Sequence, residues 1–261
     1  MNNRKMVFTV FMFCLAAALY SQAENDFVLD GTILVKYQGT ANEVIIPASL
    51  GIKQIGNYAF HNAEMTAIVI PPTVVSIADL AFARCENLVK INIPANVASI
   101  GKSVFSGCTS LSEITVDRKN RAYTSLDGVL FDKAITILLK YPPAKKGQSY
   151  SIPKTVKQID HYAFAENEII ANITIPLGIT EIADFSFMGC TKLVSIVIPA
   201  TVTSIGVSSF NGCQSLREIT IPASVKIVAD FAFSNCRSLP QAVRDDIRNR
   251  FGEWAIFDRG G

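Results

Sequence analysis

Five cysteines beyond the first 23 residues are the side chains best suited to chemistry: Cys85, Cys108, Cys190, Cys213 and Cys236. A thiolate is a nucleophile and a metal ligand, and thiols of exported proteins also pair as disulfides. Structural zinc sites typically place their cysteines about two to four residues apart, whereas neighbouring cysteines here lie 23 residues apart or further. The spacing favours a ladder of buried thiols, one per repeated segment, over a metal site or a catalytic cysteine. One or two disulfides between neighbouring segments are the alternative.

Two histidines and the acidic residues offer no second reactive cluster. His61 follows Phe60 by one residue, whereas His161 precedes Phe164 by three, so a repeat does not bring the imidazoles to equivalent places. A catalytic site needs unlike groups that converge on one point, and no paired spacing recurs among the 22 acidic residues. The sequence also lacks a phosphate-binding glycine loop, a G-x-S-x-G elbow and an H-E-x-x-H motif. We therefore expect a protein that is not an enzyme and that uses no cofactor or metal.

The cysteines belong to an internal repeat of 23 residues. Phenylalanine recurs at this interval from Phe82 to Phe105 and again from Phe164 to Phe233, within the pattern I-P-x-x-V-x-x-I-x-x-x-[AS]-F-x-x-C-x-x-L-x-x-I-x-[IV]. A period of this length indicates a solenoid in which each repeat stacks on the next. We count seven repeats, which begin at Pro47, Pro71, Pro94, Pro153, Pro176, Pro199 and Pro222.

Each repeat predicts one coil of the solenoid. The L-x-x-I-x-[IV] half alternates apolar and polar residues, as a strand with one buried face does, and the following proline ends that strand. The V-x-x-I part predicts a second short extended segment, and the [AS]-F-x-x-C part predicts a tight or helical turn. Equivalent strands of seven stacked coils predict a parallel ladder about 34 Å long, with columns of Phe, Leu, Ile and Cys side chains.

The stretch from Cys85 to Phe105 follows the pattern C-x-x-L-x-x-I-x-I-P-x-x-V-x-x-I-G-x-x-A-F, with Val104 as the one substitution. In this pattern it resembles the 23-residue leucine-rich repeat of bacterial exported proteins called BspA-like or treponemal-type. The resemblance extends from Pro47 to about Leu239, apart from one insertion. It implies a mostly β leucine-rich-repeat solenoid. For exported members it also implies adhesion to host or neighbouring cells through a macromolecular partner.

The N-terminal 46 residues predict a leader and a start module. Residues 1–23 place Arg4 and Lys5 before an apolar run that ends in Ser21-Gln22-Ala23, which is typical of a secretory signal peptide. A retained membrane anchor is the alternative, although the run is shorter than the roughly 20 residues that a spanning helix needs. Residues 24–46 then form a start module that covers the first coil, before repeats 1–3 in residues 47–116.

Residues 117–152 interrupt the repeat pattern before repeats 4–7 in residues 153–239. Within this insertion, Leu126-Asp127-Gly128 matches Leu29-Asp30-Gly31 of the start module. Lys140-Tyr141 likewise matches Lys36-Tyr37. Because both segments lead into a run of coils, we interpret the insertion as a second start module. A functional loop on a binding face is the alternative.

Residues 240–261 predict a capping helix and tail over the open end of the solenoid, as repeat arrays require. Ser238 and Gln241 have the spacing of a capping box. Apolar residues recur on one face of the expected helix: Val243, Ile247 and Phe251. We expect Trp254 or Phe257 to cover the edge of the last coil. A helix that binds a partner is the alternative.

The charge balance restricts the choice of partner and compartment. Cleavage of the leader removes Arg4 and Lys5 from 24 basic residues, which leaves 22 against 22 acidic residues. Such a chain has no overall electrostatic attraction for nucleic acid or anionic lipid. We interpret the short basic runs Asp117–Arg121 and Ala144–Gly147 as solvated loops. After cleavage no segment is long and apolar enough to span a membrane, so we expect an exported protein, in the periplasm, on the cell surface or secreted.

The predicted ladder offers a flat face on which a partner could bind. Its outward positions carry mostly small and polar residues: Lys90, Asn92, Glu113, Thr115, Asn172, Thr174, Ser195, Val197, Glu218 and Thr220. Such a face suits a protein or glycan partner better than a small molecule in a deep pocket. The alternative is a structural spacer of the cell envelope, with an ordinary solvated sheet face.

Overall fold

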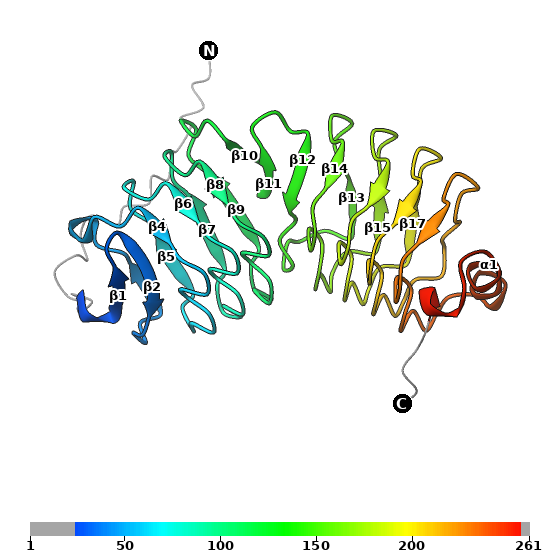
Figure 1. The fold of residues 1–261 in the computed structure, drawn as a ribbon, viewed down its shortest axis with the longest axis horizontal. Helices are drawn as coiled ribbons and strands as arrows, with labels where there is room; N and C mark the ends of the chain where they lie inside the picture. The colour runs from blue at the N-terminus through cyan, green and yellow to red at the C-terminus, as the bar shows by residue number, and fades with distance from the viewer. Residues whose placement is uncertain (1–23, 257–261) are drawn as a thin grey trace, which may run out of the picture.

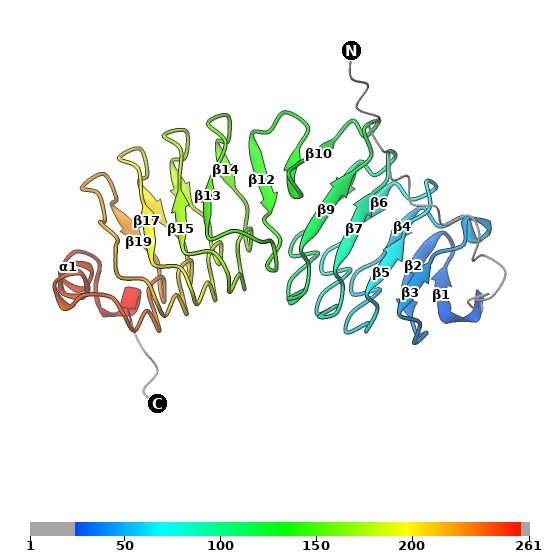
Figure 2. The ribbon, with the colours of Figure 1, turned by 180° about the vertical axis from the view of Figure 1, so that it is seen from behind.

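The computed structural model describes residues 24–256, which form a curved solenoid with its coils in chain order (Figure 1). The N-terminal hairpin of β1 (Phe27–Asp30) and β2 (Ile33–Tyr37) lies at one end, and the helix α1 (Gln241–Phe251) lies at the other. Figure 2 shows the same order from behind. The predicted mostly β repeat solenoid is confirmed. The leader predicted at residues 1–23 and the side chain of Phe257 lie outside the described residues.

The L-x-x-I-x-[IV] half of each of the first five repeats forms a strand of the first ladder, because its isoleucines point into the core while the residues between them face solvent. In β7 (Lys90–Ile93), for example, Ile91 and Ile93 are buried and Lys90 and Asn92 are exposed. The other strands of this ladder are β3 (Glu43–Ile45), β5 (Ala67–Val69), β9 (Glu113–Val116), β13 (Ser149–Ser151), β15 (Asn172–Thr174) and β17 (Ser195–Val197).

The V-x-x-I part of each repeat forms a second ladder of two-residue parallel strands. These strands are β4 (Gln54–Ile55), β6 (Ser76–Ile77), β8 (Ser99–Ile100), β14 (Gln158–Ile159), β16 (Glu181–Ile182), β18 (Ser204–Ile205) and β19 (Ile227–Val228). The start hairpin β1–β2 is antiparallel and then pairs in parallel with β4. Short 3₁₀ helices lie at Glu24–Asp26, Ala48–Leu50 and Glu253–Ile256.

The insertion divides the first ladder, which we predicted as one continuous sheet. Its strands form two sheets, with the orders β3-β5-β7-β9 and β13-β15-β17. Between them lie three strands of the insertion, β10 (Tyr123–Leu126), β11 (Val129–Asp132) and β12 (Ile137–Lys140). The Ile114 N–H of β9 donates to the Gly128 carbonyl in the turn between β10 and β11, at 2.9 Å. The backbone edge that β9 would offer to the next coil is therefore taken by the insertion.

The interior consists of two apolar clusters that meet at β11. Leu130 packs into the N-terminal cluster, whereas Val129 and Phe131 pack into the C-terminal one. The repeat phenylalanines stack as two columns, with neighbouring ring centroids between 5.0 and 5.9 Å apart. Tyr37 begins the first column and Tyr141 the second, since each ring lies beside the first phenylalanine of its block.

The turn around each phenylalanine is not helical, because it contains two residues with positive φ. One lies two positions before the phenylalanine: Tyr58, Leu80, Ser103, Tyr162, Phe185, Ser208 and Phe231. The other lies two positions after it: Asn62, Arg84, Gly107, Glu166, Gly189, Gly212 and Asn235. Left-handed residues interrupt a right-handed helix, and glycine and asparagine adopt this conformation most readily. The second position therefore explains the G or N that often precedes the cysteine.

The C-terminal segment closes the last coil partly in the way the sequence predicts. Ile247 of α1 is buried, and Val243 and Phe251 pack against the core. The capping box is wrong, because the helix begins after Pro240 and no side chain caps it. Trp254 lies at the edge of the last coil, where its ring, 58% exposed, packs edge-on against the Phe231 ring with 6.1 Å between the centroids. The Trp254 carbonyl accepts the N–H of Phe231 at 2.7 Å.

Candidate functional site

The candidate site is the outward face of the first ladder, which we call the ladder face. Its N-terminal half carries the register pairs Lys90–Glu113 and Asn92–Thr115. Its C-terminal half carries two further pairs, Asn172–Ser195 and Thr174–Val197. Glu218 extends this second half through an isolated bridge to Ser195, and Thr220 is exposed two residues later. The sequence-predicted residues thus line up on two sheets, separated by the insertion.

Polar side chains of the ladder face interact with one another across the strands. Lys90 Nζ lies 2.6 Å from Glu113 Oε2, and both side chains are substantially exposed. The Thr115 hydroxyl donates to Asn92 Oδ1 at 3.0 Å. An exposed ion pair contributes only about 0.2–1 kcal/mol to stability. These contacts therefore fix the directions of the side chains more than they hold the coils together.

Apolar side chains are interspersed with the polar ones on this face. Ile45 and Val69 are opposite one another and about half exposed, and Val197 is 63% exposed. Two hollows of the described surface lie elsewhere, one beside Lys140 and one beside Lys119. The ladder face is therefore broad and flat, with alternating polar and apolar contacts. A surface of this kind suits a macromolecule and offers no enclosed site for a small ligand.

The thiols form a column inside the coils, away from the ladder face. Each Sγ donates to the carbonyl of the phenylalanine one coil earlier, at 3.0–3.2 Å: Cys85 to Phe60, Cys108 to Phe82, Cys190 to Phe164, Cys213 to Phe187 and Cys236 to Phe210. All five thiols are fully buried and free. Burial, followed by hydrogen bonding to the neighbouring thiols of Cys190 and Cys236, raises the pKa of Cys213 well above its ordinary value. A buried thiol with a raised pKa is a poor nucleophile.

Comparison with known families identifies the coils. Residues 36–137 and 144–258 match the family described as BspA type leucine-rich repeat region, in six copies. The chain belongs to the BspA-type leucine-rich repeat family. Comparison with curated proteins gives no match.

Solved structures share the fold of this BspA-type chain. It is similar to a leucine-rich cell surface protein from Faecalibacterium prausnitzii A2-165, with 28% identity and a TM-score of 0.63 over 84% of this chain and 60% of that one. It is also similar to a leucine-rich repeat protein from Bacteroides ovatus ATCC 8483, with 27% identity and a TM-score of 0.52 over 80% of this chain and 57% of that one. The pneumococcal vaccine antigen PcpA, at 19% identity, shares the fold alone, with a TM-score of 0.58 over 83% of this chain and 78% of that one. The chain thus spans less than two thirds of the length of the first two proteins.

Asn167 occupies the cysteine position of the first BspA-type coil after the insertion, three residues after Phe164. Its Nδ2 donates to the carbonyls of Pro142 and Pro143, at 3.2 and 2.9 Å. Its Oδ1 accepts the N–H groups of Ile169 and Ile170, at 3.0 and 2.7 Å. Sequence reasoning missed this residue, although the F-x-x-N in place of F-x-x-C was the available signal.

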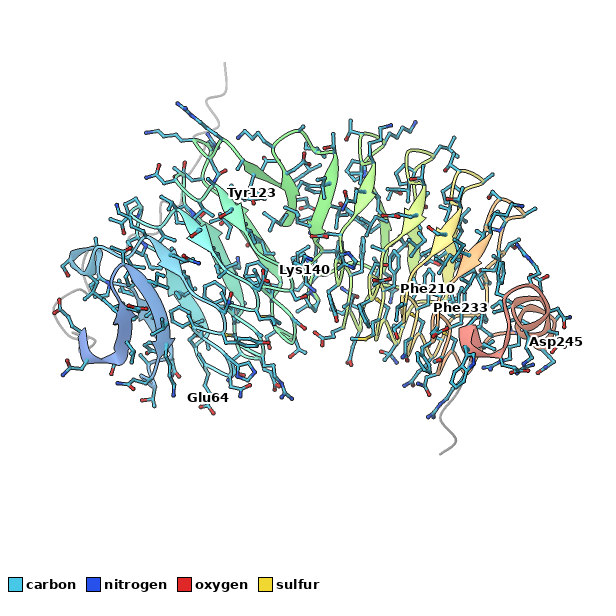
Figure 3. All side chains as sticks on the ribbon, viewed as in Figure 1. Glu64, Tyr123, Lys140, Phe210, Phe233 and Asp245 are labelled. Atoms are coloured by element: carbon cyan, nitrogen blue, oxygen red, sulfur yellow. The ribbon has the colours of Figure 1, made fainter. Side chains whose placement is uncertain are left out.

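Lys140 is the second residue that sequence reasoning missed, because nothing in the pattern distinguishes it from the exposed Lys36. Its side chain is buried at the junction of the two blocks (Figure 3), and Nζ donates to the carbonyl of Tyr162 at 2.9 Å. Burial lowers the pKa of Lys140, and nearby Glu166 partly offsets that shift. Glu166 Oε2 in turn accepts the Gly107 N–H of the first block at 2.7 Å. Lys140 and Glu166 therefore replace backbone hydrogen bonds that stacked coils make elsewhere.

The two histidines do not form a reactive cluster with the buried thiols. His61 lies edge-on to Tyr58, and Nδ1 of the exposed His161 lies 3.9 Å from Asp184 Oδ2. Within residues 24–256, no three His, Cys, Asp or Glu side chains gather as metal ligands would. In the same range, no helix has the length and apolar character needed to cross a membrane.

Proposed function

We propose that this chain is an exported, non-catalytic BspA-type leucine-rich repeat protein that binds a protein or glycan partner through its ladder face. The observation that carries the proposal is the face itself. Side chains such as Asn92, Thr115 and Thr174 stand in register on a rigid, flat surface that no element of the described chain covers. Preorganised side chains lose little conformational entropy when a partner binds.

The comparisons support the compartment part of this proposal. One similar solved protein is described as a cell surface protein. The buried, free thiols are compatible with export because thiols of other molecules cannot reach them without unfolding. We infer that the partner is a macromolecule of the host or of a neighbouring cell.

The test is a matched pair of arginine substitutions. Thr174→Arg places a long cation in the middle of the ladder face, whereas Asn57→Arg places the same cation on an exposed turn outside it. The purified mature protein is applied to an array of immobilised extracellular-matrix proteins and glycans. We expect at least one array component to bind, and Thr174→Arg to weaken that binding at least about tenfold while the control leaves it unchanged, since about 1.4 kcal/mol corresponds to a factor of ten.

Two results would contradict the proposal. Equal binding by both variants would mean that the partner uses another surface. No binding to any array component or to intact neighbouring cells would favour the spacer function instead. Both substituted side chains are exposed, so equal melting temperatures serve as the folding control.

A further inference from the structure

A basic edge crosses the junction of the two blocks, on turns that lie beside one another. Asn120 attaches the loop of residues 117–122 to the preceding turn, since its Nδ2 donates to the carbonyls of Pro94 and Val97 at 2.7 and 2.9 Å. The Lys133 N–H donates to Ala122 at 2.8 Å, and the Lys157 N–H donates to Thr136 at 2.7 Å. The turns at residues 94–98, 117–122, 132–136 and 153–157 are therefore consecutive. We call this run of turns the proline edge.

Six exposed cations lie on the proline edge: Arg118, Lys119, Arg121, Lys133, Lys154 and Lys157. Only two acidic residues lie on these turns, and the carboxylates of both accept hydrogen bonds from backbone N–H groups. Asp117 Oδ1 accepts the Lys119 N–H at 2.8 Å, and Asp132 accepts the N–H groups of Thr136 and Ile137. Among the described residues, the side chains of Lys119, Arg121, Lys133, Lys154 and Lys157 form no ion pair.

The edge formed by the phenylalanine turns has the opposite charge. Its acidic residues are Glu64, Asp79, Glu86, Asp160, Glu166, Glu168, Asp184 and Asp230, and its exposed basic residues are Arg84, Lys102, Lys192 and Arg237. Figure 3 shows Glu64 on the lower edge of the arch and Tyr123, which follows the basic loop, on the upper edge. The balanced net charge of the mature chain thus conceals two edges of opposite sign.

A groove on the proline edge provides a second, geometric observation. It is lined by small side chains, including Ala95, Ala98 and Ala122, together with Lys119 and Arg121. Two N–H groups of this lining are already hydrogen-bonded. The Ala98 N–H donates to Val75, and the Ala122 N–H donates to Asn120 Oδ1. A peptide strand therefore cannot pair with these groups, whereas a sugar ring can pack on the alanine methyl groups.

Asn120 makes the groove a fixed feature rather than a loose loop. It is 1% exposed, and its Oδ1 also accepts the Tyr123 N–H at 2.8 Å. The buried amide thus makes two donor and two acceptor bonds, and the basic side chains on either side of it must point outward.

We propose that the proline edge binds a linear anionic polysaccharide, whose carboxylates or sulfates pair with the cations of consecutive turns while one sugar ring packs in the groove. Lysine and arginine are the side chains that bind such anions. The described edge lacks the exposed aromatic platform of single-stranded nucleic-acid sites, because the Tyr123 hydroxyl is held by the Ile100 N–H. An anionic membrane would need an apolar surface, and Leu177 is the one strongly exposed apolar side chain on the next turn. The site is separate from the ladder face.

The experiment compares two triple variants of equal charge change. The edge variant is Lys119→Ser, Arg121→Ser, Lys133→Ser. The matched control is Lys102→Ser, Lys192→Ser, Arg237→Ser, which removes three exposed cations from the other edge. Heparin and polygalacturonate are the probes, with dextran, polyglutamate and anionic vesicles as comparison surfaces, in physiological salt. We expect the wild-type protein and the control to bind heparin or polygalacturonate, and the edge variant to bind at least about tenfold more weakly with a shallower salt dependence.

Each other outcome overturns the proposal. If the wild-type protein binds neither polysaccharide, the proline edge is not a polyanion site. If both triple variants lose binding equally, the binding depends on total charge and not on this edge. Binding to polyglutamate or to vesicles as tight as to the polysaccharides assigns the edge to a different partner. Thr174→Arg of the ladder face is expected to bind heparin like the wild type, so failure here is distinguishable from failure of the proposed function.

Discussion

Removal of the Asn167 side chain gives the sharpest test of how the two blocks are joined. Asn167 is fully buried and makes four hydrogen bonds, two to carbonyls of the insertion and two from N–H groups of its own turn. At a net contribution of about 1 kcal/mol per bond, Asn167→Ala is expected to lower the free energy of unfolding by about 4 kcal/mol. Water that enters the cavity would reduce this loss, and the four groups left unpaired would increase it.

Asn167→Asp separates the two halves of this interaction without a change in volume. The aspartate keeps an oxygen for the N–H groups of Ile169 and Ile170, but it turns a second oxygen towards the carbonyls of Pro142 and Pro143. We expect Asp to destabilise about as much as Ala at neutral pH, and less at low pH, where a protonated carboxyl donates again. Asn167→Cys restores the repeat consensus and is expected to lie between Ala and the wild type.

Guanidinium unfolding followed by far-UV circular dichroism provides the measurement. Trp254 fluorescence serves as a second probe, because this residue sits at the C-terminal end and reports whether that block unfolds separately. A change of less than about 0.5 kcal/mol for Asn167→Ala is the size expected of an ordinary surface substitution. Such a result would refute the claim that this amide holds the insertion onto the second block.

Three further predictions concern the core. The buried hydroxyls of Ser186 and Ser209 have no hydrogen-bond partner in the described part of the protein. Substitution by alanine, which other repeats use at this position, should therefore raise the free energy of unfolding by up to about 1 kcal/mol at each site. A lower free energy of unfolding in chemical denaturation would contradict this. Burial, with a smaller effect of Asp127, raises the pKa of Tyr141 to about 12. The Tyr141 hydroxyl ionises near pH 10 in the unfolded state but stays protonated in the folded state, so its contribution to stability should be complete below about pH 10 and fall towards pH 12. Tyr141→Phe should weaken this fall. An unchanged pH profile of unfolding in this variant would refute the role of Tyr141. The five thiols should resist a thiol reagent in the native mature protein and all react in guanidinium without reductant; fast native labelling, or fewer than five reactive thiols after unfolding, would contradict the buried column.

The repeat pattern predicted the parts of the fold that depend on one coil and its neighbour. The spacing of Phe164, Phe187 and Phe210 placed their rings in one column, because stacked coils superpose equivalent positions. Alternation within β7 likewise identified Lys90 and Asn92 as outward residues. Such predictions need only a period and a burial pattern, and both are local properties of the sequence.

The junction could not be predicted in the same way, because its contacts join residues with no shared repeat position. The Gly107 N–H to Glu166 hydrogen bond spans 59 residues, and it exists only because the insertion removes the regular coil that would follow Gly107. The burial of Lys140 has the same cause. The matching Lys-Tyr dipeptides suggested equivalent start modules, but Lys36 has no second block beside it and stays exposed. At the junction, where the repeat is interrupted, side chains make hydrogen bonds that backbone groups of stacked coils make elsewhere. The repeat period does not predict which side chains do so.

For a related reason, net charge does not describe how charge is distributed over the solenoid. A net charge sums over the whole surface, yet at physiological salt exposed charges are screened beyond about 8 Å. On one side the two edges are joined by strands such as the four-residue β7, about 13 Å long, and on the other by two-residue strands such as β14, about 7 Å long. The polyanion that we propose for the proline edge is expected to interact with Lys119, Arg121 and Lys133, with the acidic turns partly screened from it. In a solenoid, the quantity that decides electrostatic binding is the charge of one edge, and the salt dependence of heparin binding measures it directly.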